Sequence, residues 1–330
     1  MLGLVVSQVG AGAIVARLGS RPLVLVGALG YAAGLVPVGL STSFGALALS
    51  LGLVGFANGV LDVSMNVHGL AVERHLKRPI LATLHAAFSF GALAGAAFGG
   101  AVAAAGVGVE EHLTSAAVLG ALVAVVAFLG LLPASADASP EGPAVARPTR
   151  ALAVIGLFAF CVLLSEGAVN DWSAVYLEGE LDASDGVAAV GLAAFSLTMG
   201  MGRLAGDRMS LALGPVRLAR GGAALAATGM TIALAGGGPA AAIAGFAVMG
   251  LGLAALFPIA LRAAAERTGT PGPAVAAVSA TGYLGLLAGP PLVGLLSDAV
   301  GLRAALVLVA GLCAAAAVLA GGVRAPVRSR

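Results

Sequence analysis

Charged residues are scarce in this sequence. Asp, Glu, Lys and Arg make up only 10% of the 330 residues, against about 25% in soluble domains. Apolar residues make up 60%, against about 45–50% in soluble proteins. A soluble core cannot bury so much apolar sequence at this length. The composition therefore excludes a soluble globular protein and indicates that lipid solvates much of the chain.

Aromatic residues are also few, at 5% with a single Trp, and Ala, Gly, Leu and Val carry the hydrophobicity. Glycine, in contrast, is abundant, with 50 residues. Small residues let membrane helices approach closely, because helix association in lipid depends on packing rather than on expelling water. We therefore expect closely packed membrane helices.

Several function classes lack their usual residues. The 17 basic and 15 acidic residues nearly balance, and no basic run is longer than Lys77-Arg78, so we expect no nucleic-acid partner. Cys161 and Cys313 both lie in apolar stretches, and we expect buried small hydrophobes rather than a disulfide or metal pair. No GxSxG, HExxH or phosphate-loop motif occurs, so we expect no enzyme activity, no cofactor and no metal site.

Long apolar stretches follow one another along the chain. A membrane helix needs about 20 mostly apolar residues, which predicts an all-α polytopic protein with about eleven transmembrane helices, the first one short. The predicted spans are 1–16, 23–40, 45–70, 80–105, 113–133, 151–175, 186–205, 218–236, 240–262, 273–296 and 302–322.

The distribution of basic residues between these spans predicts the orientation. All of the 17 Lys and Arg residues except Arg303 fall on one side, and Arg203, Arg208, Arg217 and Arg220 surround the turn after the seventh span. Loops on the other side hold acidic residues such as Glu110, Glu178 and Asp182. Under the positive-inside rule, this predicts a multi-pass protein of a bacterial-type inner membrane, with an external N-terminus and a cytoplasmic C-terminus.

One long polar segment, 134–150, is rich in Pro, Ala and Ser and is expected to be a flexible cytoplasmic linker. It separates a five-helix bundle, 1–133, from a six-helix bundle, 151–330. Motifs repeat across it: Gly91-xxx-Gly95 matches Gly285-xxx-Gly289, and Pro79 matches Pro273, both at an offset of 194. This register predicts two homologous, pseudo-symmetric halves and places the missing helix first in the first half.

Gly12-Ala-Ile-Val-Ala-Arg17-Leu-Gly19-Ser-Arg21-Pro resembles the cytoplasmic loop signature of the major facilitator superfamily, with Ala16 where that family usually has an acid. The second-half copy, Gly202-Arg-Leu-Ala-Gly206-Asp207-Arg208, keeps the acid. Asn58-Gly-Val-Leu-Asp62 and Glu166-Gly-Ala-Val-Asn170-Asp171-Trp172 resemble helices of bacterial fucose-permease-like members.

The resemblance implies two helical bundles around a central cavity that opens alternately to each side. It also implies that Asp207 helps hold the halves in one state, against a helix N-terminus whose dipole favours negative charge. Pseudo-symmetry makes the helix that begins at Pro79 the expected partner of Asp207. The remaining residues of the conformational loops are expected to be Gly12, Arg17, Gly19, Arg21, Gly202, Gly206 and Arg208.

Two carboxylates are expected near the middle of their spans. Asn58, Asp62 and Asn66 share one helix face, and Glu166 is followed at i+4 by Asn170. Ionisable groups inside membranes usually serve function, and a poorly solvated carboxyl group can take up and release a proton. We expect Asp62 or Glu166 to couple transport to protons; the alternative is a structural hydrogen-bonded contact between helices.

Four further residues are weaker candidates. Asp171 and Trp172 lie nearer the external end of their span, and Trp172 either stacks on a solute ring or belongs to an interfacial aromatic belt. His68 and His85 lie at a similar depth and either join the proton path or, more simply, pack with satisfied hydrogen bonds.

These patterns favour secondary transport of a small polar organic solute, sugar-like in chemistry, by a proton-coupled monomer with no cofactor. The first alternative is a drug or metabolite efflux antiporter of the same superfamily, whose cavity should be more apolar and aromatic. The second is a non-transporting membrane sensor or a truncated product, which the absence of a first helix leaves open.

Overall fold

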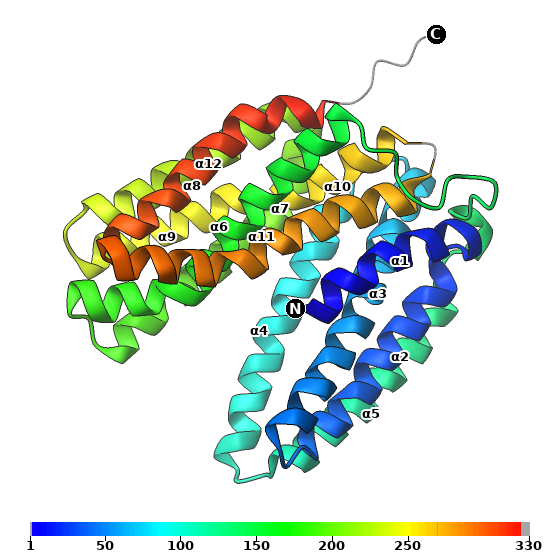
Figure 1. Ribbon diagram of the computed structural model, residues 1–330, viewed down its shortest axis with the longest axis horizontal. Helices are drawn as coiled ribbons and strands as arrows, with labels where there is room; N and C mark the ends of the chain where they lie inside the picture. The colour runs from blue at the N-terminus through cyan, green and yellow to red at the C-terminus, as the bar shows by residue number, and fades with distance from the viewer. Residues whose placement is uncertain (1, 269, 325–330) are drawn as a thin grey trace. The chain divides into compact units, whose positions relative to one another are not determined.

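The computed structural model describes residues 2–268 and 270–324, and almost all of them are helical (Figure 1). Within these residues, ten helical spans are long and apolar enough to cross a membrane, and the shorter apolar helix Leu2–Leu18 precedes them. The prediction of about eleven helices is thereby confirmed. Arg328 and Arg330, which contribute to the predicted orientation, lie outside the described residues.

The first five helices are α1 (Leu2–Leu18), α2 (Ser20–Gly39), α3 (Phe44–Leu76), α4 (Leu81–Ala104) and α5 (Val109–Leu129). A short 3-10 helix, η1 (Ala134–Ala136), opens the linker. The remaining helices are α6 (Arg150–Leu181), α7 (Asp185–Leu213), α8 (Pro215–Ala235), α9 (Pro239–Leu253), α10 (Leu256–Glu266), α11 (Pro271–Val300), α12 (Leu302–Leu319) and the 3-10 helix η2 (Ala320–Val323).

One predicted span is divided into two helices, α9 and α10, with Ala254 and Ala255 between them. Pro258 explains the break, because proline has no N–H to donate to the carbonyl of Ala254, four residues earlier, and its ring crowds that carbonyl. The two pieces together still have the length and hydropathy of one membrane span.

The chain forms two compact units. Unit 1 contains residues 1–78, 90–147 and 268–280, and unit 2 contains residues 79–89, 148–267 and 281–330. Each unit therefore includes the beginning of a helix, α11 or α4, whose remainder belongs to the other unit. The division at the linker that the sequence suggests, 1–133 and 151–330, stays a prediction.

Unit 1 is organised around α3, which packs against α1 and α2, while α2 also packs against α5. Unit 2 is organised around α6, which packs against α7 and α12, with α9 against α7 and α8. Most of α6 is buried within its unit, including Cys161. Cys161 and Cys313 are both free and buried, as the sequence predicts.

The linker is more ordered at its beginning than the prediction of a flexible segment suggests. Ser139 donates its backbone N–H to the carbonyl of Ala16 at the end of α1. Asp137 is buried and accepts hydrogen bonds from the backbone N–H and the hydroxyl of Ser20, the first residue of α2. Because Gly19 precedes α2 and has no side chain to cap it, the linker supplies the carboxylate that caps this helix.

Candidate functional site

A buried polar cluster lies halfway along α3 in unit 1. Asp62 follows the first residue of α3 by 18 positions and precedes the last by 14. Its Oδ2 accepts a hydrogen bond of 3.0 Å from Nε2 of Gln8 on α1. Its Oδ1 accepts one of 3.2 Å from Nδ2 of Asn66, which also donates to the backbone carbonyl of Asp62 at 2.8 Å. We call Gln8, Asp62 and Asn66 the Asp62 cluster.

The three side chains of the cluster are buried: Asp62 is 3% exposed, Asn66 2% and Gln8 0%. One turn away, Gly59 of α3 faces Leu4 and Ser7 of α1 so closely that a Cβ at position 59 would overlap both. The glycine lets α1 approach α3, and this approach brings the amide of Gln8 to the carboxylate of Asp62.

The structure brings together Asp62 and Asn66, as their i,i+4 spacing predicts, but leaves Asn58 half-buried outside these hydrogen bonds. Gln8 was missed by sequence reasoning. The sequence gives only a weak indication of this role, because Gln8 is one uncharged polar residue in a short apolar helix and belongs to no polar pattern with helical spacing.

A second polar cluster lies in unit 2. Nη2 of Arg203 on α7 is 3.4 Å from Oε1 of Glu166 on α6, and Nη1 of Arg203 donates to the hydroxyl of Ser89 in α4 at 2.6 Å. The side chains of Arg203 and Glu166 are 10% and 19% exposed. We call Glu166, Arg203 and Ser89 the Glu166 cluster.

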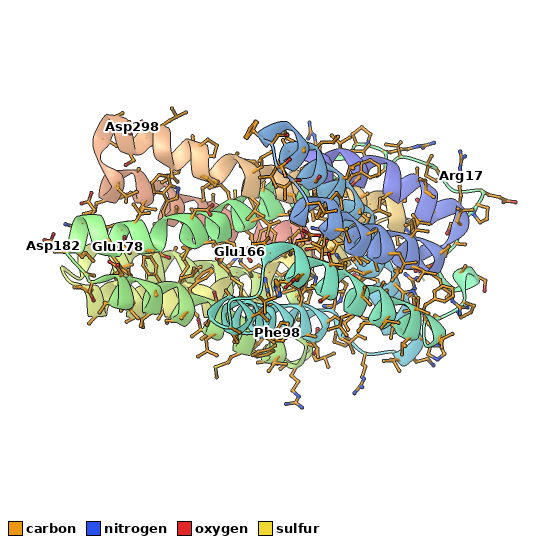
Figure 2. The ribbon with its side chains drawn as sticks, turned by 90° about the horizontal axis from the view of Figure 1, so that it is seen from below. Arg17, Phe98, Glu166, Glu178, Asp182 and Asp298 are labelled. Carbon is orange, nitrogen blue, oxygen red and sulfur yellow. The ribbon has the colours of Figure 1, made fainter. Side chains whose placement is uncertain are left out.

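Sequence reasoning places Arg203 near the end of the predicted span 186–205 and does not identify its ion pair with Glu166. Helix α7 continues to Leu213, and Arg203 is buried within it. The ion pair with Glu166 explains how an apolar helix contains a guanidinium, because a charge in a poorly solvated place needs a partner. Figure 2 shows Glu178, Asp182 and Asp298 toward one end of unit 2 and Glu166 farther from that end.

The neighbours of Glu166 on α6 lie outside this cluster. Asn170 and Asp171 are exposed, and Trp172 is half-buried with its ring against Gly294 of α11. The indole N–H of Trp172 has no hydrogen-bond partner among the described residues.

The two histidines have different surroundings. Nε2 of His68 accepts a hydrogen bond of 3.3 Å from the backbone N–H of Leu132, so Nδ1 carries the proton and donates to the hydroxyl of Ser20 at 2.8 Å. Ser20 in turn donates to Asp137. His85 instead lies edge-on to the ring of Phe257, with centroids 6.0 Å apart. Both ring nitrogens of His68 therefore have hydrogen-bond partners, as expected for a packing histidine.

The residues of the loop signature lie mostly on helices. Gly12 and Arg17 lie on α1, Arg21 on α2, and Gly202, Gly206, Asp207 and Arg208 on α7. The loops themselves are single glycines, Gly19 and Gly214, with φ of 76° and 79° and ψ of 166° and 156°. These backbone angles suit glycine, because residues that have a side chain rarely adopt them. The match between the two glycines supports the internal repeat.

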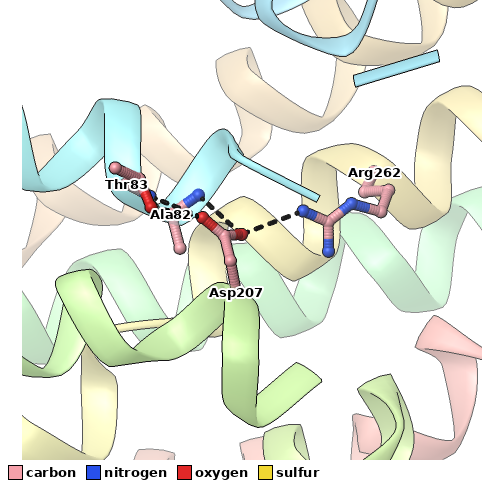
Figure 3. A network of polar contacts seen from close by, with 4 residues as sticks. All are labelled: Ala82, Thr83, Asp207 and Arg262. Carbon is pink, nitrogen blue, oxygen red and sulfur yellow. Dashed lines mark hydrogen bonds and ion pairs between the residues drawn. The ribbon is translucent and has the colours of Figure 1, made fainter. Parts of the chain in front are cut away.

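Asp207 caps the beginning of α4 within unit 2 (Figure 3). Its carboxylate accepts hydrogen bonds from the backbone N–H groups of Ala82 (3.2 Å) and Thr83 (2.8 Å) and from the Thr83 hydroxyl (2.8 Å). Arg262 of α10 forms an ion pair with it at 3.3 Å. The carboxylate thus accepts hydrogen bonds from N–H groups that lack partners within α4, and it lies at the positive end of the α4 dipole.

The corresponding contact in unit 1 lacks the acid. There, α1 meets the beginning of α11 so closely that a Cβ at Gly12 would lie 3.0 Å from the carbonyl oxygen of Gly272. Ala16, buried at the position where the signature usually has an acid, provides no acceptor side chain. Among residues 2–268 and 270–324, no group of three His, Cys, Asp or Glu side chains is arranged to hold a metal ion.

Comparison with known proteins agrees with this architecture. An uncharacterized transporter of Sinorhizobium fredii is 33% identical over 97% of this chain and 85% of its own length. The membrane protein MosC of Rhizobium meliloti is 32% identical over 88% of this chain and 71% of its own.

Solved structures share the fold at low sequence identity. The E. coli fucose:proton symporter FucP superposes with a TM-score of 0.79 at 16% identity, covering 97% of this chain and 87% of that protein. The proton:xylose symporter XylE gives 0.74 at 12% identity, covering 96% and 82%.

The sequence profile of the Major Facilitator Superfamily matches residues 155–330, which is more than half of the chain. Members of this family are multi-pass membrane transporters of small molecules and not enzymes. The profile match, the bacterial relatives that match most of the chain and the helical fold together show that this chain belongs to the Major Facilitator Superfamily.

Proposed function

We propose that this transporter carries a small polar organic solute across a bacterial inner membrane by alternating access, coupled to the movement of protons. The observation that carries the proposal is the Asp62 cluster, a carboxylate in the middle of an apolar helix that is 3% exposed and bonded by two carboxamides. Ionisable groups are costly to keep inside a membrane and commonly mark solute or proton pathways.

Asp62 and Glu166 have different roles in this proposal. Glu166 lies 3.4 Å from the guanidinium of Arg203, so protonation of Glu166 would break an ion pair in a poorly solvated place. The hydrogen-bond donors of Asp62 in the Asp62 cluster are the neutral amides of Gln8 and Asn66, so protonation of Asp62 breaks no ion pair within the cluster. Asp62 is therefore assigned the proton, and Glu166 with Arg203 forms a fixed polar pair.

The solute assigned to this transporter is polar and carries hydroxyl or similar groups. Asn58, Asn170 and Asp171 add half-buried or exposed polar groups to the same two helices as the clusters, and Trp172 offers a ring for stacking. An exporter of lipophilic cations should instead present more aromatic side chains, which this chain has at only 5%. The fold neighbours named as fucose:proton and proton:xylose symporters support a sugar-like solute.

The topology in this proposal follows the basic residues. The protein acts as a monomer with a cytoplasmic C-terminus, and the loops after α1, α3, α5 and α7 face the cytoplasm. Asp207 biases the balance between the inward-open and outward-open states by capping α4.

Ligand-dependent thermal stabilisation of the purified protein tests the solute class. The panel contains fucose, xylose, other neutral monosaccharides and sugar acids, with ethidium as a lipophilic cation. A binding solute should raise the unfolding temperature, since a ligand at 100 times its Kd stabilises by about 2.7 kcal/mol.

A monosaccharide that raises the unfolding temperature supports the proposal. Stabilisation by ethidium alone would favour the efflux alternative. Binding of a solute that the reconstituted protein never moves across vesicles would favour a sensor.

A further inference from the structure

The structure leaves one atom of the Asp62 cluster unexplained. Oε1 of Gln8 is buried and has no hydrogen-bond partner among the described residues, while Nε2 of the same amide donates to Asp62 at 3.0 Å. A buried carbonyl oxygen without a partner is costly, about 1–3 kcal/mol. Its presence beside a carboxylate in the middle of a membrane helix points to a role beyond packing.

We propose that Gln8 is a positioning residue for the proton on Asp62, and that its amide turns over by 180° when Asp62 changes protonation state. With Asp62 ionised, Nε2–H of Gln8 donates to Oδ2, as the structure has it. When a proton from water binds to Oδ2, the amide presents Oε1, which accepts the new O–H. This inference rests on the proposed function, in which Asp62 carries the proton.

The chemistry of the carboxamide fits both states. Its two ends have similar size, but one donates and the other accepts, so turning requires no extra space. The turn breaks only the bond that protonation itself abolishes, because the Oε1 end has no partner to lose. A buried carboxyl group can thus gain or lose a proton while it keeps a hydrogen bond to Gln8.

Asn66 cannot perform this exchange. Its Nδ2 donates both to Oδ1 of Asp62 and, at 2.8 Å, to the backbone carbonyl of Asp62. That carbonyl accepts hydrogen bonds and never donates them, so turning the Asn66 amide would place two oxygens against each other. Asn66 therefore fixes Oδ1, and Gln8 is the amide that follows the proton on Oδ2.

Other charged groups of unit 1 lie away from this bond. Arg17 follows Gln8 by nine residues on α1, about 13 Å along the axis. On α3, His68 and Glu73 lie two and three turns beyond Asp62, and His68 bonds to Ser20 and Leu132. Arg21, at the beginning of α2, stacks on Phe128 of α5, and Tyr31 of α2 is exposed. The segments 90–104 and 271–280, also in unit 1, carry no titratable residue. The groups that remain are Arg74, His75, Lys77 and Arg78 at and just after the end of α3, Glu110, Glu111 and His112 at the beginning of α5, and Asp137, Glu141 and Arg147 in the linker.

Infrared difference spectra between two pH values, recorded on the full chain in lipid vesicles without any solute, test the inference. The carboxylic acid band that disappears in Asp62→Asn belongs to Asp62. In Gln8→Met, which keeps an unbranched side chain but removes the amide, the pH midpoint of that band should rise by about 0.5–1 unit. The direction follows because the bond to the charged carboxylate is stronger than the bond to the neutral acid.

The same variant should also move the C=O frequency of the Asp62 band upward, because its O–H loses an acceptor. Ser7→Ala is the matched control: Ser7 adjoins Gln8 on α1 and is buried, but its hydroxyl bonds to the carbonyl of Leu4. It should leave both readouts unchanged. Gln8→Leu provides a second variant if Gln8→Met folds poorly in size-exclusion chromatography.

The outcomes separate the inference from the proposed function. An Asp62 band whose midpoint and frequency are the same in wild type and both Gln8 variants overturns the role of Gln8 and leaves proton coupling through Asp62 intact. Absence of any band that depends on Asp62 shows that this residue does not titrate, which overturns both.

Discussion

The ion pair between Arg203 and Glu166 is the residue-scale feature with the clearest consequence for stability. The two side chains are 10% and 19% exposed, and Arg203 also donates to Ser89. Removing one member of a poorly solvated pair leaves the other without its counter-charge, which costs more than the pair itself contributes.

We predict that Arg203→Met lowers the unfolding temperature of the purified protein and that the double variant Arg203→Met, Glu166→Gln recovers part of the loss. The coupling energy should be about 1–3 kcal/mol, as for contacting residues elsewhere. Thermal unfolding of the four proteins in a double-mutant cycle measures it, with the exposed Arg208→Met as a control. Strictly additive effects would contradict an energetic link between the two side chains.

Contacts between residues of one helix can be predicted from the sequence, whereas contacts between helices cannot. Asp62 and Asn66 are predictable because their i,i+4 spacing places them on one face of one helix. The partners Gln8 and Arg203 come from other helices, and nothing in their local sequence indicates which helix they meet. Arg203 lies near the end of its predicted span, and its local sequence does not identify Glu166 as its counter-charge.

At the scale of elements, the beginning of α4 depends on a carboxylate from α7. Asp207 accepts from two backbone N–H groups and one hydroxyl of α4 and pairs with Arg262. The sequence-based hypothesis named the helix that begins at Pro79 as the partner of Asp207, and the contact is present. The effect of this contact on the inward/outward balance stays a prediction.

We predict that Asp207→Asn frays the first turn of α4, because an amide is a weaker acceptor for helix N–H groups and loses the ion pair. The effect should resemble the loss of a helix cap, about 0.5–2 kcal/mol. Hydrogen–deuterium exchange at residues 81–85 should accelerate, whereas the exposed neighbour Arg208→Gln should leave it unchanged. Cysteine accessibility labelling should also show an altered balance of states.

Unchanged exchange at residues 81–85 in Asp207→Asn would show that the cap does not stabilise α4. Altered exchange with an unchanged accessibility pattern would separate the structural cap from the proposed conformational role.

Most element boundaries follow from hydropathy, whereas the exceptions have specific causes. The break between α9 and α10 follows from Pro258, a signal present in the sequence. Helix α7 extends to Leu213, eight residues beyond the predicted span 186–205, because hydropathy marks only the apolar part of a helix. The linker was expected to be flexible, yet Asp137 is held by Ser20 on a helix 117 residues earlier.

At the scale of the whole molecule, two repeated halves carry unequal versions of the same devices. Gly19 and Gly214 make equivalent connections between helices, but Asp207 has its counterpart in Ala16, which cannot cap a helix. The carboxylates also differ: Asp62 is bonded by two amides, and Glu166 is paired with a guanidinium. This asymmetry agrees with an assignment of the proton to one half of the molecule.

Solute accumulation by proteoliposomes under an imposed proton gradient tests the central claim most directly, with the solute that stabilises the purified protein. The account predicts that wild type accumulates this solute against its gradient, and that Asp62→Asn exchanges it in counterflow but does not accumulate it. Asp298→Asn, an exposed carboxylate at one end of unit 2 (Figure 2), should behave as wild type. Accumulation by Asp62→Asn at the wild-type level would contradict the account.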